Sequence, residues 1–506
     1  MSRARRFARN VGWNMIGQAG SIAVNLLMTP FLIGRMGLET YSLYILLHAA
    51  SSYLMMMSLG AGGATVKYIA EFSALGERGC LEKTIEYGAL VHVAGVAAAA
   101  ALLAVGAPLV ARGLLKVPAP LMDTAIFVLR CAAAGAVFAT LAQFSTAVMQ
   151  GFQRFDWHNG LSLIQSLLMP LGAGAAFIAG KGLRAAACWY VLLNAAICLL
   201  SLVMVARLAA RASAVGRDRV FHFREFARYC MSLALGPLAW VISFQSDKLF
   251  IANALPLSEL TLYAVPAGLL QRLQAVPAAM SSVLVPMMSE IGGPQSQEQL
   301  SRLYTKSVRV LLWSVLPALV LLFALMPQFL TLWLGADFGG RSVWPARLLV
   351  LAQTVMMLTY IPNSVAMSRG KPWYLSASAW GQASISLVAW WWLVPRYQLL
   401  GMATGALLAQ ILPVGVYLFA VHGKLLRLPA GRFFSEALGA PLAGAALLMA
   451  LVFPLHHLAS SWPRLLGLGA AGTLLYYSSA WLLLGREDRE FIRGLVRQEF
   501  TLQRAS

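Results

Sequence analysis

The sequence predicts an all-α polytopic membrane protein, and three observations support this fold class. The chain of 506 residues is 59% hydrophobic. Only 11% of it is charged, well below the roughly one quarter that is usual in soluble domains. Apolar windows of about 20 residues, the length that crosses a hydrocarbon core of about 30 Å, recur along almost the entire chain. We therefore expect a chain that is embedded in a membrane over most of its length.

These windows predict about fourteen transmembrane helices with short connections. The first, which follows the basic stretch "MSRARRFARN", is too long for the apolar core of a cleavable signal peptide, so we expect it to remain as an anchor. The approximate bounds of the fourteen spans are 11–33, 42–66, 88–108, 124–148, 159–179, 185–206, 230–254, 262–289, 308–329, 345–367, 375–394, 401–421, 438–455 and 465–484.

The positive charge of the chain follows the predicted topology. The formal net charge is +20, which in a soluble protein would suggest nucleic acid as a partner. Here the Lys and Arg residues concentrate on one predicted side, at the N-terminus, in 207–228 and in 486–504. This asymmetry is the positive-inside signal, so we expect both termini in the cytoplasm, membrane lipids as partners and no nucleic acid.

The basic linker 206–229 divides the chain into two related parts. At a constant offset of 219, Gly17 matches Gly236, Leu43-Tyr44 matches Leu262-Tyr263, and Glu71 matches Glu290. Six spans separate the two windows, so the repeats would have the same orientation in the membrane. We expect a six-helix lobe with its linker over 1–222, a second six-helix lobe over 223–432, and two extra helices with a basic tail over 433–506.

Four ionisable residues fall inside predicted spans, where each costs several kcal/mol unless it faces water or a partner. They are Arg130, Asp247, Lys248 and Arg272. Counted from the external helix ends at 1.5 Å per residue, Arg130 and Lys248 lie roughly 10 Å deep and Arg272 roughly 15 Å. A ring of three cations between two lobes suits an anionic headgroup. Asp247 either neutralises Lys248 or Arg272, or couples transport to a proton or sodium ion.

Polar residues also recur at helical spacing inside several spans. Asn14, Gln18, Ser21 and Asn25 share one face of the first span. Such a stripe either joins helices or lines a wet cavity. Two further groups have the same character, namely Asn159, Ser162, Gln165 and Ser166 in the fifth span and Gln353, Tyr360 and Asn363 in the tenth.

Prolines and the remaining motifs add little chemistry. Pro237 in the seventh span and Pro266, Pro277 and Pro286 in the eighth permit kinks. The five cysteines lack paired spacing, His456-His457 has no further ligands, and no nucleotide or hydrolase motif is present. We expect no metal, no cofactor and no catalytic residue.

Four segments of the chain resemble the Wzx-like polysaccharide flippases of the multidrug, oligosaccharidyl-lipid and polysaccharide exporter superfamily. They are "NLLMTPFLIGRMGLETYSLY" (25–44), "LGAGGATVKYIAE" (59–71), "QSDKLFIANALPLSELTLYAVPAGLL" (245–270) and "VPMMSE" (285–290). That family usually has Gly at the position of Ser42, which we place in a loop. The resemblance implies two six-helix lobes around a V-shaped cavity with alternating access. It also implies substrate-binding cations at Arg130, Lys248 and Arg272, and a functional aspartate at Asp247.

The resulting functional prediction is a flippase in the bacterial inner membrane rather than an enzyme. It would move an undecaprenyl-pyrophosphate-linked oligosaccharide from the cytoplasmic to the periplasmic leaflet, with the polar stripe of Asn14, Gln18 and Asn25 facing the sugars. A polysaccharide polymerase or glycosyltransferases are expected partners. Three alternatives remain: an ion-coupled drug or cation antiporter of the same superfamily, a glycan polymerase or ligase, and a membrane scaffold. The short external loops, the longest over 331–347, argue against the polymerase or ligase.

Overall fold

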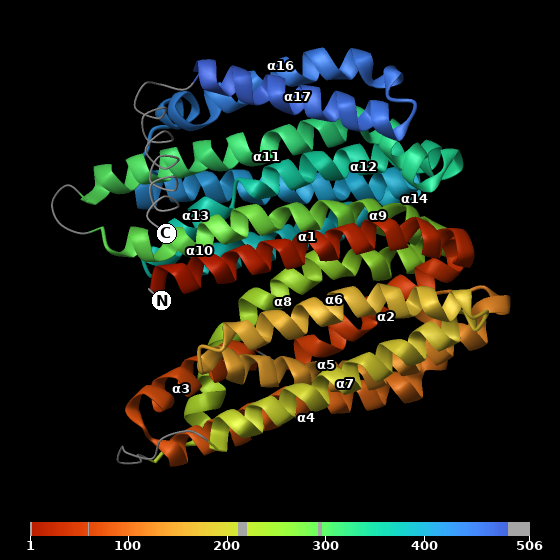
Figure 1. Cartoon of the computed structure of the whole chain (residues 1–506), viewed down its shortest axis with the longest axis vertical. Helices are drawn as coiled ribbons and strands as arrows, with labels where there is room; N and C mark the ends of the chain where they lie inside the picture. Colours follow the sequence, from red (N-terminus) through yellow and green to blue (C-terminus); the bar gives the residue numbers. More distant parts are fainter. Residues whose placement is uncertain (1–2, 59, 211–219, 292–295, 484–506) are drawn as a thin grey trace. The chain divides into compact units, whose positions relative to one another are not determined.

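The structure, a computed structural model, is helical throughout the part of the chain that it describes (Figure 1). It describes residues 3–58, 60–210, 220–291 and 296–483. Within these ranges, the side chains of 3–19, 235–237, 240, 243–244, 296 and 480–483 lie outside the description. An all-α chain is what a bilayer requires, because a helix satisfies its own backbone hydrogen bonds where no water can.

The chain forms two compact units, Met1–Ala264 and Val265–Ser506. The first holds α1 (Arg3–Met36), α2 (Leu38–Met55), η1 (Met56–Ser58), α3 (Ala61–Leu75), α4 (Arg78–Leu109), η2 (Val110–Leu114), η3 (Ala119–Leu121), α5 (Met122–Gly151), α6 (Phe155–Ile178), α7 (Gly182–Ala210), α8 (Phe223–Ala254) and the start of α9 (Leu257–Gln271). The second continues with η4 (Arg272–Gln274), α10 (Ala275–Ser289), α11 (Ser296–Leu334), α12 (Ala336–Met357), α13 (Tyr360–Ser368), α14 (Trp373–Ala420), η5 (Val421–Leu426), α15 (Ala430–Phe433), η6 (Phe434–Leu438), α16 (Gly439–Leu455), η7 (His456–Leu458) and α17 (Trp462–Leu483). The predicted division at 222 and 432 stays a prediction.

The predicted all-α membrane fold is confirmed, while the number of spans stays a prediction. Each predicted span falls on helical segments of the structure. By length and composition alone, eight helices among the described residues can cross a membrane, or nine if the bent pair α2 and α3 forms one span. The structure therefore supports a multi-pass chain without fixing the expected count of about fourteen.

In the first unit, α5 lies among α2, α4 and α7, which all contact it (Figure 1). Lipid tails are as apolar as these side chains, so helices in a bilayer gain more from close packing than from the hydrophobic effect. Gly135 on α5 allows this close packing, because a Cβ there would lie 2.1 Å from the ring of Tyr190 on α7. Deeper in this unit, Ile69, Phe72 and Phe226 are fully buried in one apolar cluster.

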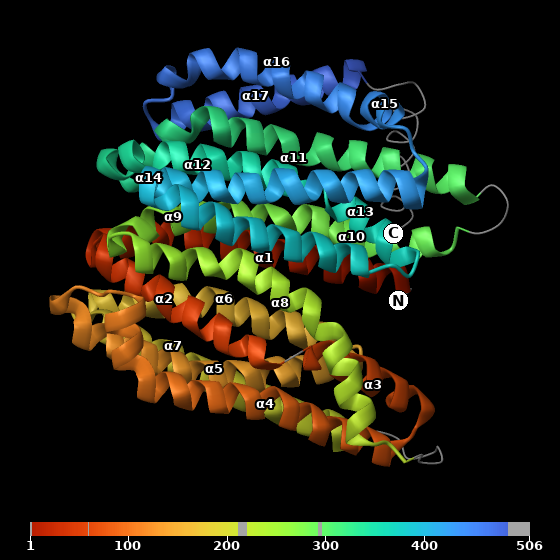
Figure 2. The same cartoon turned by 180° about the vertical axis from the view of Figure 1, so that it is seen from behind.

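The predicted second span, 42–66, is divided in the structure by η1 and by Gly60. Gly60 has φ of 73°, a conformation that costs other L-residues energy. A Cβ at Gly60 would also lie 2.7 Å from the carbonyl oxygen of Cys230 on α8. Figure 2 shows the resulting close approach of α3 to the N-terminal part of α8. Gly60 thus allows both the turn before α3 and the close packing of α3 against α8.

In the second unit, α14 is a helical hairpin rather than one long span. Gln398 inside it has φ of 48° and ψ of −127°, which no helix accommodates. On either side of Gln398, Trp390 donates its Nε1–H to the carbonyl of Met402 at 3.1 Å, and Gln410 bonds Gln382 at 3.4 Å. The two arms are therefore antiparallel and match the predicted spans 375–394 and 401–421.

The helix α11 packs against α12, α16 and α17 (Figure 1).

A reciprocal hydrogen-bond contact joins α2 to α9 within the first unit. Ser42 donates to the carbonyl of Leu257 at 2.6 Å, and Thr261 donates to the carbonyl of Leu38 at 2.9 Å. The two hydroxyl oxygens lie 2.7 Å apart. Each hydroxyl carries one proton, so these bonds are alternative arrangements of two protons. The predicted offset of 219 relates Ser42 to Thr261 and Leu38 to Leu257. A contact in which i meets j and j meets i is the mark of a two-fold relation.

Two loop predictions are wrong in detail. Ser42 lies inside α2 and is fully buried, because Gly37 with φ of 75° ends the preceding loop and α2 begins at Leu38. The stretch 331–347 is not an extended loop either. Gly335 alone, with φ of 97°, separates α11 from α12, since its positive φ turns the chain within one residue.

We predict that Ser42 and Thr261 stabilise the first unit as a coupled pair. Ser42→Ala and Thr261→Val should each lower the free energy of unfolding by about 1 kcal/mol, because each strands buried polar groups. The double variant should lose less than the sum of the two, which a double-mutant cycle in mixed micelles measures.

Thr140→Val is the matched control, since the buried Thr140 hydroxyl bonds the Ala136 carbonyl of its own helix at 2.8 Å. Its effect should stay below about 0.5 kcal/mol. Strictly additive effects at Ser42 and Thr261 would contradict the reciprocal contact.

Candidate functional site

The two adjacent charges on α8 form an ion pair. Nζ of Lys248 lies 3.3 Å from Oδ1 of Asp247, and the same oxygen accepts the backbone N–H of Lys248 at 2.8 Å. Asp247 is buried, at 6% exposed, and Lys248 is half-buried. Neighbouring side chains on a helix diverge by about 100°, so the long lysine stem has to curl back to reach its neighbour. In the structure, one role of Asp247 is thus to neutralise the charge of Lys248.

Aromatic hydroxyls from two other helices surround this pair. Tyr53 on α2 donates to the hydroxyl of Ser246 at 3.0 Å. Tyr53 and Tyr263 on α9 both lie close enough to Asp247 for an electrostatic interaction. The ionic group of the first unit therefore has hydrogen-bonding neighbours from α2 and α9. Such surroundings lower the cost of charge inside an apolar protein.

Arg130 lies on α5 and is exposed. Its Nε donates to the carbonyl of Ala104 on α4 at 3.3 Å. Within the described part of the chain it forms no ion pair, so its guanidinium keeps donors for an anion. Arg130 starts about 12 Å along α5, at 1.5 Å per residue from Met122.

Arg272 belongs to the second unit and sits where the predicted eighth span breaks. The residues Arg272–Gln274 form the 3₁₀ segment η4 between α9 and α10. Pro277 explains the break, because its ring lacks an N–H for the carbonyl four residues earlier and clashes with it. Since α9 begins at Leu257, Arg272 lies about 22 Å along the helix at 1.5 Å per residue, deeper than the sequence predicted. The ring formed by Arg130, Lys248 and Arg272 stays a prediction.

Two of the polar stripes join neighbouring helices. Gln165 on α6 donates to Asn194 on α7 at 3.0 Å, and Asn194 is buried. In the second unit, Gln274 in η4 donates to Gln353 at 3.3 Å and accepts from Tyr360 at 3.2 Å. These side chains act as interhelical hydrogen bonds, one of the two roles expected for them. The second network also ties the segment of Arg272 to α12 and α13.

The stripe of the first span is described in part. Asn25 is half-buried and donates to the carbonyl of Ser21, one turn earlier on α1, at 2.8 Å. Asn14 and Gln18 lie on α1, but their side chains fall outside the described residues. The role of this stripe toward sugars therefore stays a prediction.

Sequence reasoning missed a buried arginine in the second unit. Arg347 on α12 is 7% exposed and donates its Nε–H to the carbonyl of Phe323 at 3.0 Å. The guanidinium carbon lies 5.2 to 5.5 Å from the ring centres of Trp344, Phe323 and Phe453. The sequence placed Arg347 at the end of an external loop, where a cation stays in water and loses no hydration. Its aromatic neighbours come from three helices, so only the nearby Trp344 was visible as a signal.

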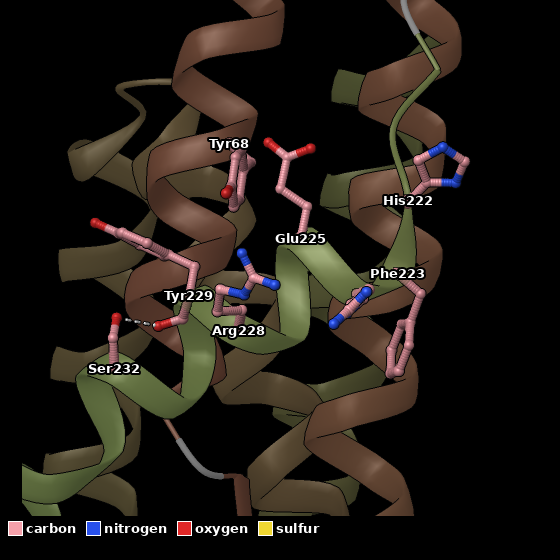
Figure 3. A pocket seen from close by; sticks show the side chains of 8 residues that line it. Tyr68, His222, Phe223, Glu225, Arg228, Tyr229 and Ser232 are labelled. Atoms are coloured by element: carbon pink, nitrogen blue, oxygen red, sulfur yellow. Dashed lines mark hydrogen bonds between the residues drawn. The ribbon is translucent and has the colours of Figure 1, made fainter.

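A pocket with a volume of about 890 Å³ lies between α3 and the start of α8 in the first unit. Figure 3 shows Glu225 and Arg228 extending from α8 toward Tyr68 of α3, with Tyr229 on the same helix. Arg224 and His222 complete its polar lining. The sequence showed this stretch only as part of a basic linker, because the contribution of α3 depends on the tertiary fold.

A comparison with protein families decides the assignment of the chain. The family model described as "Polysaccharide biosynthesis protein" matches residues 90–341, from α4 to α12. The match covers just under half of the chain. That result confirms the resemblance to the polysaccharide flippases stated above. No curated protein sequence matches the chain.

Several solved structures share the fold of this chain. The lipid II flippase MurJ in an inward closed conformation has a TM-score of 0.68 at 12% identity, and the match covers 96% of this chain and 99% of that one. An inward-facing MATE transporter of the MOP superfamily has 0.59 at 15%, covering 81% and 98%. A Vibrio cholerae MATE transporter has 0.55 at 17%, covering 83% and 96%. This chain therefore shares its fold with these solved proteins.

We predict that Asp247 and Lys248 depend on each other for stability. Asp247→Asn removes the carboxylate that neutralises the half-buried Lys248 and should lower the free energy of unfolding by about 3 kcal/mol. The double variant Asp247→Asn/Lys248→Gln removes both charges and should recover most of that loss. Unfolding in mixed micelles measures both. A double variant that is less stable than the single one would show that the two residues do not stabilise the unit as a pair.

Proposed function

We propose that this polysaccharide biosynthesis protein is a flippase for an undecaprenyl-pyrophosphate-linked oligosaccharide. It would carry the repeat unit of a surface polysaccharide from the cytoplasmic to the periplasmic leaflet of the bacterial inner membrane, with both chain termini in the cytoplasm. The observation that carries the proposal is the set of charged groups within the apolar helices of a transporter fold: the Asp247–Lys248 pair, Arg130 and Arg272. An anionic substrate would give these three cations a purpose.

The chemistry of the three cations suits a pyrophosphate. Guanidinium groups such as those of Arg130 and Arg272 can fork onto phosphate oxygens with two hydrogen bonds each. Lys248 adds a compact charge on a flexible stem. We infer that the Lys248 ammonium leaves Asp247 when the substrate arrives and returns when it departs. Asp247 then holds Lys248 in the empty carrier, so that neither group is left unpaired during the return step.

Asp247 also has a second candidate role as the coupling site. A carboxylate in an apolar environment can take up a proton near physiological pH, and its protonation would release Lys248. In either role the side chain supplies no bond-making chemistry, so we propose a transporter without enzymatic activity. The polar stripe of Asn14, Gln18 and Asn25 would face the sugars, and a polymerase or glycosyltransferases would act on the substrate before or after transport.

The antiporter alternative keeps support from the MATE likenesses, which share the fold. Those matches leave a substantial part of this chain uncovered, whereas the likeness to the lipid II flippase extends over nearly all of it. The antiporter would also need cavity carboxylates for cationic drugs. Among the four ionisable residues predicted inside spans, Asp247 is the single acid, and it is already paired with Lys248.

We predict that Arg130→Ala, Lys248→Ala and Arg272→Ala each impair glycan export. Every variant removes charge-assisted hydrogen bonds to phosphate, so export at limiting substrate should fall roughly tenfold or more. The measurement is the amount of lipid-linked glycan at the outer face of bacterial cells and the amount of surface polysaccharide, at equal expression. Lipid-linked glycan should accumulate inside.

Arg396→Ala provides the control, because Arg396 is exposed and donates to the Trp392 carbonyl of its own helix at 2.8 Å. Its export should match wild type. Unchanged export in all three cation variants, together with loss of resistance to a cationic drug, would favour the antiporter instead.

A further inference from the structure

We propose that the pocket between α3 and the start of α8 binds the phosphate headgroup of an anionic phospholipid from the cytoplasmic leaflet. This site is separate from the cations on α5, α8 and η4 discussed above. Its evidence is the pair Arg224 and Arg228, which has no ion-pair partner among the described residues, and the apolar side chains around the pocket.

Arg224 and Arg228 supply the positive charge of the pocket. They stand four residues apart on α8, so their side chains project from the same face of the helix. Both are exposed, and neither forms an ion pair or a side-chain hydrogen bond within the part of the chain that the structure describes. Two guanidinium groups one turn apart can bind the oxygens of one phosphate diester between them. Their donors are thus available for a ligand.

A third cation is held in place by the aromatic wall. Nζ of Lys67 lies 4.0 Å from the ring centre of Tyr68 and 4.5 Å from that of Tyr229. Its carboxylate neighbour Glu71 is 3.7 Å away, at the edge of ion-pair range. The Tyr68 ring in turn packs on Phe221 at 4.8 Å, within a buried cluster. The wall is therefore fixed by the core of the unit.

The surroundings of the pocket indicate a lipid rather than a soluble anion. Phe223 lines the pocket and is 42% exposed, while Val220 before α8 and Met231, next to the lining residue Ser232, are 77% and 58% exposed. Both α3 and α8 continue from the pocket into apolar sequence. A phosphate site with apolar side chains at its rim matches a headgroup whose acyl chains stay in the bilayer. The positive-inside prediction places this end of the unit at the cytoplasmic leaflet, where anionic lipids attract basic segments.

The test uses the full-length protein in neutral detergent and native mass spectrometry. Dioctanoyl-phosphatidylglycerol should bind the wild type at a saturable site at least tenfold more tightly than dioctanoyl-phosphatidylcholine. Arg224→Gln/Arg228→Gln should weaken the phosphatidylglycerol affinity roughly 30-fold, the combined effect of two interfacial cations. Both positions are exposed, so the variant should remain folded, which size-exclusion chromatography checks.

Arg78→Gln/Lys83→Gln is the matched control. It removes the same charge on α4, where the two side chains are paired with Glu82 at 3.0 Å and Glu86 at 2.8 Å. Its affinity for phosphatidylglycerol should stay within twofold of wild type.

Three outcomes would overturn the proposal. The first is equal binding of phosphatidylcholine, because the phosphate charge would then not be recognised. The second is displacement of phosphatidylglycerol by millimolar inorganic phosphate, which would indicate a site for a free anion. The third is equal weakening by the pocket variant and the control variant, which would reduce the effect to net charge.

Discussion

The ion pair of Asp247 and Lys248 is the interaction on which this account depends. A charge in an apolar membrane protein is tolerated only where a partner or water stabilises it. Here an acid and a base on one helix supply each other, with tyrosine hydroxyls from α2 and α9 nearby. A pair made solely for stability could be replaced by apolar residues at little cost. In the proposed flippase the pair would have a further role, because an arriving anion would compete with Asp247 for Lys248.

The reciprocal contact of α2 and α9 complements this ionic group. Ser42 and Thr261 bond each other's helix starts, and both are fully buried. The same helices bring Tyr53 and Tyr263 to Asp247. In the proposed flippase, this two-fold contact between repeated segments beside the charged pair would serve as a structural element for alternating access. Hydroxyl pairs suit such a role, because they can exchange partners without leaving a charge unpaired.

Much of the fold could be predicted from the sequence, because hydropathy windows depend on local composition alone. The repeat offset of 219 also relates Ser42 to Thr261, but it did not predict that these two residues would touch. The contacts of individual side chains could not be predicted in the same way, because they depend on the tertiary fold. Adjacent residues on a helix point apart, so the curled stem of Lys248 was not foreseeable. Arg347 and the pocket at Arg228 depend on helices that are distant in sequence. The break at Arg272 was foreseeable from Pro277 as a kink, but not its place in the helix.

The most direct test of the account is whether Lys248 faces water. A chain with its five native cysteines replaced by alanine would carry Asp247→Asn/Lys248→Cys, so that no charge is left unpaired. Leu199→Cys on α7, 66% exposed among apolar neighbours, serves as the lipid-facing reference. We expect a membrane-impermeant, charged thiosulfonate to modify position 248 and to leave position 199 unmodified, with lipid-linked glycan protecting position 248. If both thiols were equally unreactive, the charged pair would belong to packing and the cationic pathway would be wrong.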